Sequence, residues 1–308
     1  MTEPVQGNRR LELRVPASIA NLGPGFDTLA VAVQLYLQLC VEVVDDHRGA
    51  VSFDFGDTIL RGENYIDRAY RFLARQAGHA MPSLKVNVHS EIPMCSGLGS
   101  SAAATVAGIR LYDAIAGPLT SNEMLNAATA IEGHPDNVAA AIFGGLTSTC
   151  ELPDGSCVAV RHRWPESLKM LVLTPEYELG TSVARKVLPT HYERRDAIHN
   201  IQRMVLLLNA LQTEDYSLLR EALQDRFHQP YRMKLVPGLH EILELEHPDM
   251  LGACLSGAGP SIVAFAERNA EDVAQLMKKT YAGTGIKCTV RLLAAHQEQV
   301  RTIATVQG

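Results

Sequence analysis

Two glycines and two serines stand close together within residues 91–104, in the run EIPMCSGLGSSAAA. Gly97 and Gly99 can adopt backbone angles that other residues avoid, and they let an anion approach the main chain. Ser100 and Ser101 add hydroxyl groups at the same point. The run is typical of a loop that binds phosphate, although a tight turn capped by serine has the same composition.

Two common nucleotide-binding patterns do not fit this run. A G-x-x-x-x-G-K-[ST] loop needs a lysine after its last glycine, and the sequence contains no such stretch. The dinucleotide pattern G-x-G-x-x-G also fails, because position 102 is alanine.

A second polar cluster follows the apolar segment Leu11–Val15 and has the sequence PASIANLGPGFD, from Pro16 to Asp27. Its glycines and proline predict a rigid loop between a strand and a helix, in which Asn21 and Asp27 have the most to offer a ligand. The alternative for Asp27 is a helix cap.

A third cluster, EGHPDN, covers residues 132–137 and places two carboxylates, an imidazole and an amide within six residues. It follows a helix that begins with the capping-box pattern of Thr120 and Glu123. Burying so many polar groups is costly without a ligand or metal, so the cluster indicates a site, with a solvated loop as the alternative. A fourth run of small residues, Ser256–Ser261, is either a ligand-facing loop or a hairpin turn.

The surrounding patterns predict the elements that hold these clusters. Residues 84–89 alternate as a strand does, and Ala102–Ala116 has the pattern of a helix that ends at Gly117. The expected order around the phosphate loop is therefore strand, loop, helix. Further elements are expected as a helix from 121, strands at 168–173, 251–255, 261–266 and 286–293, and helices at 196–213, 215–227, from 237 and from 270.

Composition excludes several classes of protein. The chain has 308 residues, 46% of them hydrophobic, and a formal charge of -6, so it predicts a globular protein of about two domains with no general attraction to nucleic acid. The most apolar stretch, Leu29–Val44, is interrupted by Gln34, Gln38 and Glu42, so we expect no membrane segment and a cytoplasmic location. The six cysteines lack C-x-x-C spacing and predict neither a zinc site nor a disulfide framework.

Taken together, these clusters resemble the superfamily of galactokinase, homoserine kinase, mevalonate kinase and phosphomevalonate kinase, the GHMP kinases. The similarity spans nearly the whole length. It rests on the three motifs at Pro16–Asp27, Pro93–Ala102 and Ser256–Gly259. Within the superfamily, the first motif and the residues at 132–137 are most similar to those of homoserine kinases.

The resemblance implies an α+β fold of two domains. Residues 1–160 would form an ATP-binding domain like ribosomal protein S5 domain 2, and residues 161–308 a ferredoxin-like domain. It implies phosphoryl transfer from ATP, with Mg²⁺, to the hydroxyl of L-homoserine in threonine biosynthesis. A homodimer is also expected.

The resemblance also implies the site residues. Mg²⁺ would be held by Ser101 and Glu132, and the catalytic group would be His134, Asn137 and Arg185. Homoserine would be bound by Asn21, Asp27, His134, Asn137, Arg185 and Arg232. ATP would be bound by Asn64, Pro93, Met94, Cys95, Ser96, Gly97, Leu98, Gly99, Ser100, Ser101, Ala102 and Ala103.

Several alternatives stay open at this point. Without the resemblance, Arg185 and Arg232 would be surface arginines. Asp136 adjoins Asn137, the residue expected where sister kinases carry a catalytic aspartate, and we expect the hydroxyl proton to pass late to a phosphate oxygen. The competing functions are a sister kinase acting on another small alcohol, such as mevalonate, and a binding protein that lost transfer. An acid and two arginines favour an amino-acid substrate.

Overall fold

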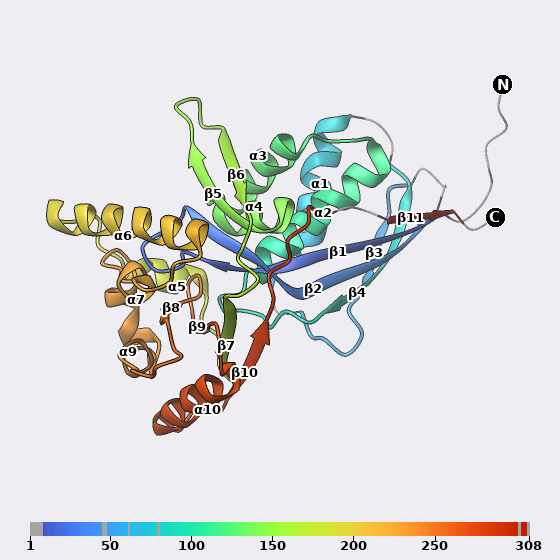
Figure 1. Cartoon of the computed structure of the whole chain (residues 1–308). Coiled ribbons are helices and arrows are strands. Elements are labelled where there is room, and N and C mark those ends of the chain that lie inside the picture. Colours follow the sequence, from blue (N-terminus) through green and yellow to red (C-terminus); the bar gives the residue numbers. More distant parts are fainter. Residues whose placement is uncertain (1–8, 45–47, 61, 79–80, 301–302, 307–308) are drawn as a thin grey trace.

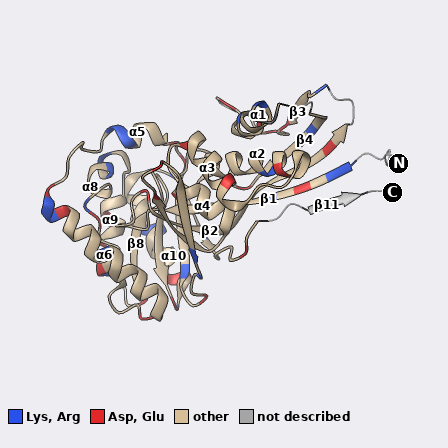
Figure 2. Ribbon diagram, turned by 90° about the horizontal axis from the view of Figure 1, so that it is seen from above, with Lys and Arg blue, Asp and Glu red and all other residues tan. Residues whose placement is uncertain are grey.

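The computed structural model describes residues 9–44, 48–60, 62–78, 81–300 and 303–306 (Figure 1). It contains two sheets with helices packed against them. No helix in these ranges is both long enough and apolar enough to cross a membrane. In Figure 2 the basic and acidic residues are interspersed along the elements.

The first sheet has seven strands and is built around the long antiparallel pair β1 (Arg9–Ala20) and β2 (Leu29–Val44). Beyond them, β4 (Ser83–Ser90) pairs with the second half of β2, and β5 (Leu146–Glu151) pairs with its beginning. The remaining strands are β3 (Val51–Asp54) on β4, β6 (Cys157–His162) on β5, and β11 (Ile303–Val306) on β1.

Alternating side chains explain how β1 faces the core. Leu11, Leu13 and Val15 point inward and are at most 2% exposed. The register with β2 shifts between Pro16 and Ala17, where proline cannot donate a ladder hydrogen bond. The strand then continues to Ala20, so the segment expected as a strand only over 11–15 delivers the chain directly to the loop that begins at Asn21.

Helices cover one face of this sheet in Figure 1. The strand, loop and helix order predicted around the glycines is confirmed: β4 leads through residues 91–99 into α2 (Ser100–Ala116). The capping box of Thr120 and Glu123 at the start of α3 (Ser121–Glu132) is also confirmed. The helices are α1 (Tyr65–Ala77), α2 (Ser100–Ala116), α3 (Ser121–Glu132) and α4 (Asp136–Phe143).

The second sheet has four antiparallel strands in the order β10, β7, β9, β8. The strands predicted there are confirmed with shifted ends: β7 (Lys169–Pro175), β8 (Gly252–Leu255), β9 (Ile262–Ala266) and β10 (Cys288–Leu293). The helices of this half are α5 (Thr181–Lys186), α6 (Arg194–Thr213), α7 (Leu219–Ala222), α8 (Gln229–Arg232), α9 (Leu239–Leu243) and α10 (Ala270–Tyr281), with short 3₁₀ turns at Met233–Leu235 and Ala282–Thr284.

Two predicted helices are wrong. After Asp27 the chain forms β2 rather than a helix, because its backbone pairs with β1 on one side and with β4 and β5 on the other. The helix expected over 215–227 exists only as α7. There the Asp225 carboxylate accepts the backbone N–H groups of Phe227, His228 and Gln229, which begins a new helix instead of continuing the old one.

Candidate active site

A cavity of about 780 Å³ gathers the four clusters predicted from the sequence. Its lining includes residues from each of the segments 21–27, 93–102, 132–137 and 257–258. These segments are far apart in the chain, and α1 and α5 add further walls through residues 64–66 and 181–185. The cavity therefore brings the four clusters together, where they can act on one ligand.

The glycine loop leads into the N-terminus of α2 with both glycines in the left-handed region, φ 79° at Gly97 and 69° at Gly99. Gly99 is the N-cap residue, and no side chain caps the helix there. The first N–H groups of α2 and its positive dipole are thus available to an anion. Ser100 and Ser101 lie at the same end of the helix and line the cavity.

Packing behind the loop also requires these glycines. A Cβ atom on Gly97 would lie 2.3 Å from the Ser256 carbonyl oxygen, and one on Gly99 would lie 2.2 Å from Ser18 Oγ. The need for glycine, expected from the approach of a ligand, thus also comes from protein atoms that occupy the space of a Cβ atom.

The small-residue run Ser256–Ser261 holds the glycine loop in place through hydrogen bonds. Ser256 Oγ donates to the Gly97 carbonyl (2.6 Å), and the Ser261 N–H donates to the Ser96 carbonyl (3.1 Å). The Gly257 N–H donates to the carbonyl of Ala20, at the end of β1. The run therefore joins the second sheet to the motifs at Pro16–Asp27 and Pro93–Ala102. Of its residues, Gly257 and Ala258 line the cavity.

Ser101 and Glu132 meet across the helix interface. Ser101 Oγ donates to Glu132 Oε2 at 2.8 Å, and Thr105 Oγ1 donates to the other carboxylate oxygen at 2.7 Å. Thr105 was missed from the sequence, although it lies one turn after Ser101 on the same face of α2. The two hydroxyls fix the carboxylate beside the helix N-terminus.

The donor set at this point suits Mg²⁺. Magnesium keeps several waters and takes few protein ligands besides phosphate oxygens. Glu132 and Ser101 supply one carboxylate and one hydroxyl, and the described residues contain no cluster of three or more His, Cys, Asp and Glu side chains that could hold a metal without substrate oxygens. A magnesium–nucleotide complex fits these residues better than a self-contained metal site does.

The cluster at 132–137 forms a connected hydrogen-bond chain at the start of α4. His134 Nδ1 lies 2.8 Å from Asp136 Oδ1, which also accepts the Asn137 N–H at 2.7 Å. Ser18 Oγ, from β1, donates to Asn137 Oδ1 at 2.8 Å. All three cluster residues line the cavity, and Asp136 is only 2% exposed.

These hydrogen bonds shift the pKa values of His134 and Asp136 in opposite directions. Burial favours the neutral form of each group, but the hydrogen bond and charge of Asp136 outweigh it and raise the pKa of His134. Burial raises the pKa of Asp136, but the hydrogen bond and charge of His134, together with the hydrogen bond from the Asn137 N–H, lower it overall. An ionised Asp136 that already accepts several hydrogen bonds is a weak base.

Asp27 and Arg185 form a bidentate ion pair in the cavity, with Arg185 Nη1 and Nη2 2.9 and 2.6 Å from the two Asp27 oxygens. Asp27 leads into the strand β2 and not into a helix, so the alternative of a helix cap is wrong. About a third of each side chain is exposed. The charges are therefore paired with each other while remaining accessible to a ligand.

Arg232 lies behind this pair and is not a surface arginine, because it is 2% exposed. Its Nη1 donates to the Gly257 carbonyl (2.9 Å), which also accepts from Asn21 Nδ2 (3.0 Å). Burial, followed by the nearby charge of Arg185, lowers its pKa to about 10. The guanidinium remains protonated at neutral pH and contributes positive charge to the wall of the cavity.

Three predicted nucleotide residues behave differently from the rest. Asn64 lines the cavity, but its side chain also caps α1, accepting from the N–H groups of Ile66 and Asp67. Leu98 and Ala103 do not line it, because their side chains pack into the hydrophobic core of the first sheet. Leu98 meets β1 instead, where its carbonyl accepts the Ser18 N–H.

Two further features of the cavity, its apolar lining and the aromatic ring beside the ion pair, were not predicted from the sequence. The apolar lining includes Phe55, Leu60 and Val88, and the signal for Val88 was its alternation within the strand at 84–89. The aromatic ring is that of Phe26, and the guanidinium carbons of Arg185 and Arg232 lie 5.5 and 5.4 Å from its centre. The cavity thus offers apolar surface for a flat group as well as charged side chains.

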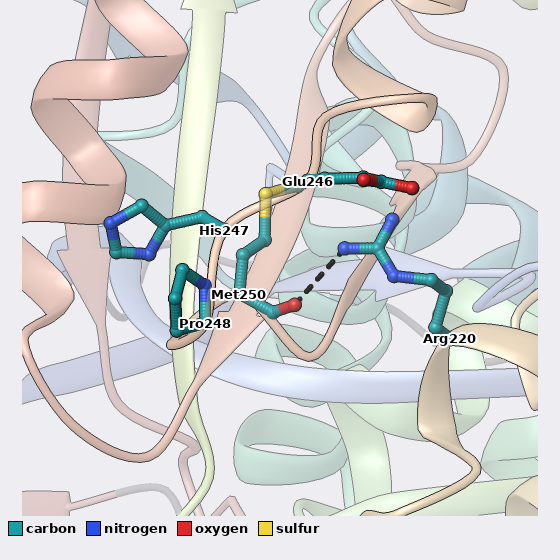
Figure 3. A pocket seen from close by; sticks show the side chains of 5 residues that line it. All are labelled: Arg220, Glu246, His247, Pro248 and Met250. Atoms are coloured by element: carbon teal, nitrogen blue, oxygen red, sulfur yellow. Dashed lines mark hydrogen bonds between the residues drawn. The ribbon is translucent and has the colours of Figure 1, made fainter.

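A second hollow, of about 410 Å³, lies beside α7 and β8 and away from these groups (Figure 3). It is lined by Arg220, Glu246, His247, Pro248 and Met250. Arg220 Nη2 already donates to the Met250 carbonyl across it, at 3.1 Å. It shares no lining residue with the larger cavity.

Comparison with known proteins identifies two matching family models. The GHMP kinases N terminal domain matches residues 64–145, and the GHMP kinases C terminal domain matches residues 207–283. The first contains α1, the glycine loop and the cluster at 132–137, and the second contains Arg232 and the small-residue run.

Similar proteins are homoserine kinases. The chain is 41% identical to homoserine kinase of Solibacter usitatus, covering 90% of this chain and 92% of that one, and 41% identical to homoserine kinase of Moorella thermoacetica, covering 92% and 96%. The crystal structure of homoserine kinase from Cytophaga hutchinsonii matches with a TM-score of 0.85 at 26% identity, over 98% of this chain and 99% of that one. A mevalonate kinase structure matches with a TM-score of 0.69 at 15% identity, which shows a shared fold alone.

Proposed function

The chain belongs to the homoserine kinase family within the GHMP kinases, and on that premise we propose how its cavity carries out the reaction. The enzyme phosphorylates the hydroxyl of L-homoserine with ATP, giving O-phospho-L-homoserine and ADP, a step of threonine biosynthesis. The observation that carries the proposal is that the Asp27–Arg185 pair and the uncapped end of α2 open into the same cavity.

ATP binding is proposed at the glycine loop and the apolar lining of the cavity. The N-terminus of α2, with Ser100 and Ser101, would bind the phosphates through backbone N–H and hydroxyl groups. The adenine would lie against the apolar side chains of Phe55, Leu60 and Val88, which line the cavity together with Asn64. A cavity with both kinds of lining suits a nucleotide better than a simple anion.

Glu132 and Ser101 are proposed to hold Mg²⁺ at the phosphates, and Thr105 would orient the carboxylate. When bound, Mg²⁺ neutralises charge on the β- and γ-phosphates. The residues of this chain contribute the helix N-terminus, which favours negative charge at the transferring group.

The amino-acid head group is proposed to bind at Asp27, Arg185 and Arg232. An ammonium group pairs with Asp27, and a carboxylate pairs with the arginines, of which Arg185 can offer the bidentate geometry that carboxylates prefer. Asn21 supports the acid, because its Oδ1 accepts the Asp27 N–H at 3.1 Å.

His134 and Asn137 are proposed to position the substrate hydroxyl. Its oxygen attacks the γ-phosphorus while the bond to the leaving ADP oxygen breaks, and the hydroxyl proton passes to a phosphate oxygen. Asn137 carries an amide, which is not a base, and Asp136 has a lowered pKa. These features support transfer by positioning and charge neutralisation rather than by a dedicated base.

The test is ADP release by the full chain with ATP, Mg²⁺ and L-homoserine, beside mevalonate and L-threonine. We expect turnover that requires both homoserine and Mg²⁺. Equal turnover with mevalonate would identify a sister kinase, for which the Asp27–Arg185 pair offers no explanation. ATP binding without turnover on any of the three substrates would instead identify a binding protein.

Other expectations stay predictions. These are the homodimer, the cytoplasmic location and the division into domains at residues 1–160 and 161–308. The pairing of β11 with β1 bears on the division, because it returns residues 303–306 to the first sheet.

A further inference from the structure

A buried imidazole lies directly behind the proposed head-group site. His228 is 0% exposed and stands immediately before α8, the short helix that ends at Arg232. It is not among the residues that line the cavity. A substrate in the cavity therefore does not contact it, and its effect must pass through neighbouring residues.

The two ring nitrogens of His228 have different partners. Nε2 lies 2.9 Å from the Gly23 carbonyl oxygen, and Nδ1 lies 3.1 Å from Arg232 Nη1. A carbonyl only accepts and a guanidinium only donates, so Nε2 carries the hydrogen and Nδ1 accepts. The ring is then neutral and connects the loop of Asp27 to the arginine.

The charges around the ring agree with this assignment. Burial lowers the pKa of His228, and although Asp225 opposes the shift, Arg232 adds to it. Asp225 Oδ2 lies 3.5 Å from Nε2. A second proton on Nδ1 would point at the guanidinium of Arg232.

His228 also supports the loop through its ring face. Phe26 stacks on it with ring centres 5.3 Å apart and an angle of 23°. The same Phe26 ring lies beneath the guanidinium groups of Arg185 and Arg232. One imidazole thus contacts the loop at Gly23 and at Phe26, the residue directly before Asp27.

A fixed frame holds His228 itself. Asp225 accepts the backbone N–H groups of His228 (2.9 Å) and Gln229 (2.7 Å) and the Asn200 Nδ2 group (2.7 Å). Asn200 Nδ2 also reaches the Pro24 carbonyl at 3.3 Å. The loop is therefore held from α6 as well as from the segment before α8.

We infer that His228 is a positioning residue for the amino-acid substrate: as the neutral Nε2–H tautomer it sets the spacing between the Asp27 loop and Arg232, and so controls homoserine affinity without contacting homoserine or ATP. This inference rests on the proposed function. Its distinguishing consequence is an effect on the KM for homoserine that the KM for ATP does not share.

Three substitutions separate the contacts. His228→Gln keeps a hydrogen-bond donor and an acceptor at similar spacing. His228→Asn has a side chain long enough to reach Arg232 but too short to reach the Gly23 carbonyl. His228→Phe keeps the ring stacked on Phe26 and loses both hydrogen bonds. We expect the homoserine KM to rise in the order wild type, Gln, Asn, Phe. The rise should be about tenfold to a hundredfold for His228→Phe, the range for a lost hydrogen bond to a charged group.

The matched control is His296→Phe. His296 is partly buried, shares a hydrogen bond with Tyr36 and contacts that ring edge-on, but it does not line the cavity. We expect both KM values of this variant to stay within twofold of wild type. The KM for ATP should likewise stay within twofold in all three His228 variants.

The outcomes are separable. Absence of homoserine-dependent turnover in the wild type overturns the proposed function and this inference with it. A working wild type whose His228 variants raise both KM values equally, or lower kcat alone, overturns only the inference. If His228→Phe does not fold, the Gln and Asn variants decide: equal homoserine KM values for these two would contradict control through the Gly23 contact.

Discussion

Arg185 donates two hydrogen bonds to Asp27, of 2.6 and 2.9 Å. The residues proposed to bind the carboxylate and the ammonium of an amino acid are therefore paired with each other. Asp27 comes from the loop between β1 and β2, and Arg185 comes from α5. A zwitterion can replace this pair without leaving a charge unpaired, because it offers an ammonium to the acid and a carboxylate to the arginine.

This relationship predicts selectivity for substrates with both charges. 4-Hydroxybutyrate lacks the ammonium, and 3-aminopropanol lacks the carboxylate, so each would leave one partner of the pair uncompensated. We expect each analogue to lose at least about 30-fold in kcat/KM, corresponding to about 2 kcal/mol. The measurement is ADP release at saturating ATP, and equal kcat/KM values for homoserine and either analogue would contradict exchange of the ion pair.

Glu132 should control the magnesium requirement. In Glu132→Gln the neutral amide attracts Mg²⁺ less than the carboxylate does, so we expect the Mg²⁺ concentration for half-maximal turnover to rise at least tenfold. Thr105→Val removes only the supporting hydroxyl and should give a smaller rise in the same direction. An unchanged requirement in Glu132→Gln, measured by Mg²⁺ titration at fixed ATP, would remove Glu132 from the site.

Gly97 should be needed for folding as well as for binding. In Gly97→Ala the new Cβ meets the Ser256 carbonyl at 2.3 Å and the backbone keeps a φ of 79°, so we expect a loss of about 3 kcal/mol or more in the free energy of unfolding. Gly155→Ala is the control, because it has φ 81° with no atom within 4 Å and should cost only about 1–2 kcal/mol. Urea denaturation of both variants measures the difference, and equal losses would mean that contact with Ser256 contributes nothing.

Asp136 should prove structural rather than catalytic. Asp136→Asn keeps an oxygen to accept from His134 and from the Asn137 N–H, so we expect kcat to fall less than tenfold, whereas loss of a general base costs about 10²–10⁴-fold. The measurement is kcat together with ATP affinity. Turnover that vanishes while ATP still binds would make Asp136 the base.

His296 should make the protein less stable in acid. Burial lowers the pKa of this imidazole, and its buried Nε2 has no hydrogen-bond partner within the described structure. A lowered pKa means that the unfolded state binds the proton more tightly, so the contribution to stability is present above the unfolded pKa of about 6.5 and is lost as the pH falls through the folded value. Between pH 7.5 and 5, wild type should lose more free energy of unfolding than His296→Phe. The measurement is denaturation of both proteins at each pH. Equal losses of free energy of unfolding in the two proteins would contradict this assignment.

The chain's local patterns predicted the parts of the site that depend on neighbouring residues. The glycine loop before α2 and the capping box of α3 follow from spacing, because backbone angles and capping hydrogen bonds are satisfied within a few residues. The motifs were also sufficient to identify the family, which the comparisons confirm.

Tertiary structure alone decided what each motif contacts. The pairing of Asp27 with Arg185 spans 158 residues, and the bond from Ser256 to Gly97 spans 159, so neither has a periodic signal in the chain. The same holds for the burial of Arg232 and for the contacts of His228 with Gly23 and Phe26 of the first motif. Sequence determined which groups were available, and packing of the two sheets determined their partners, because charge pairing and burial depend on distance in space.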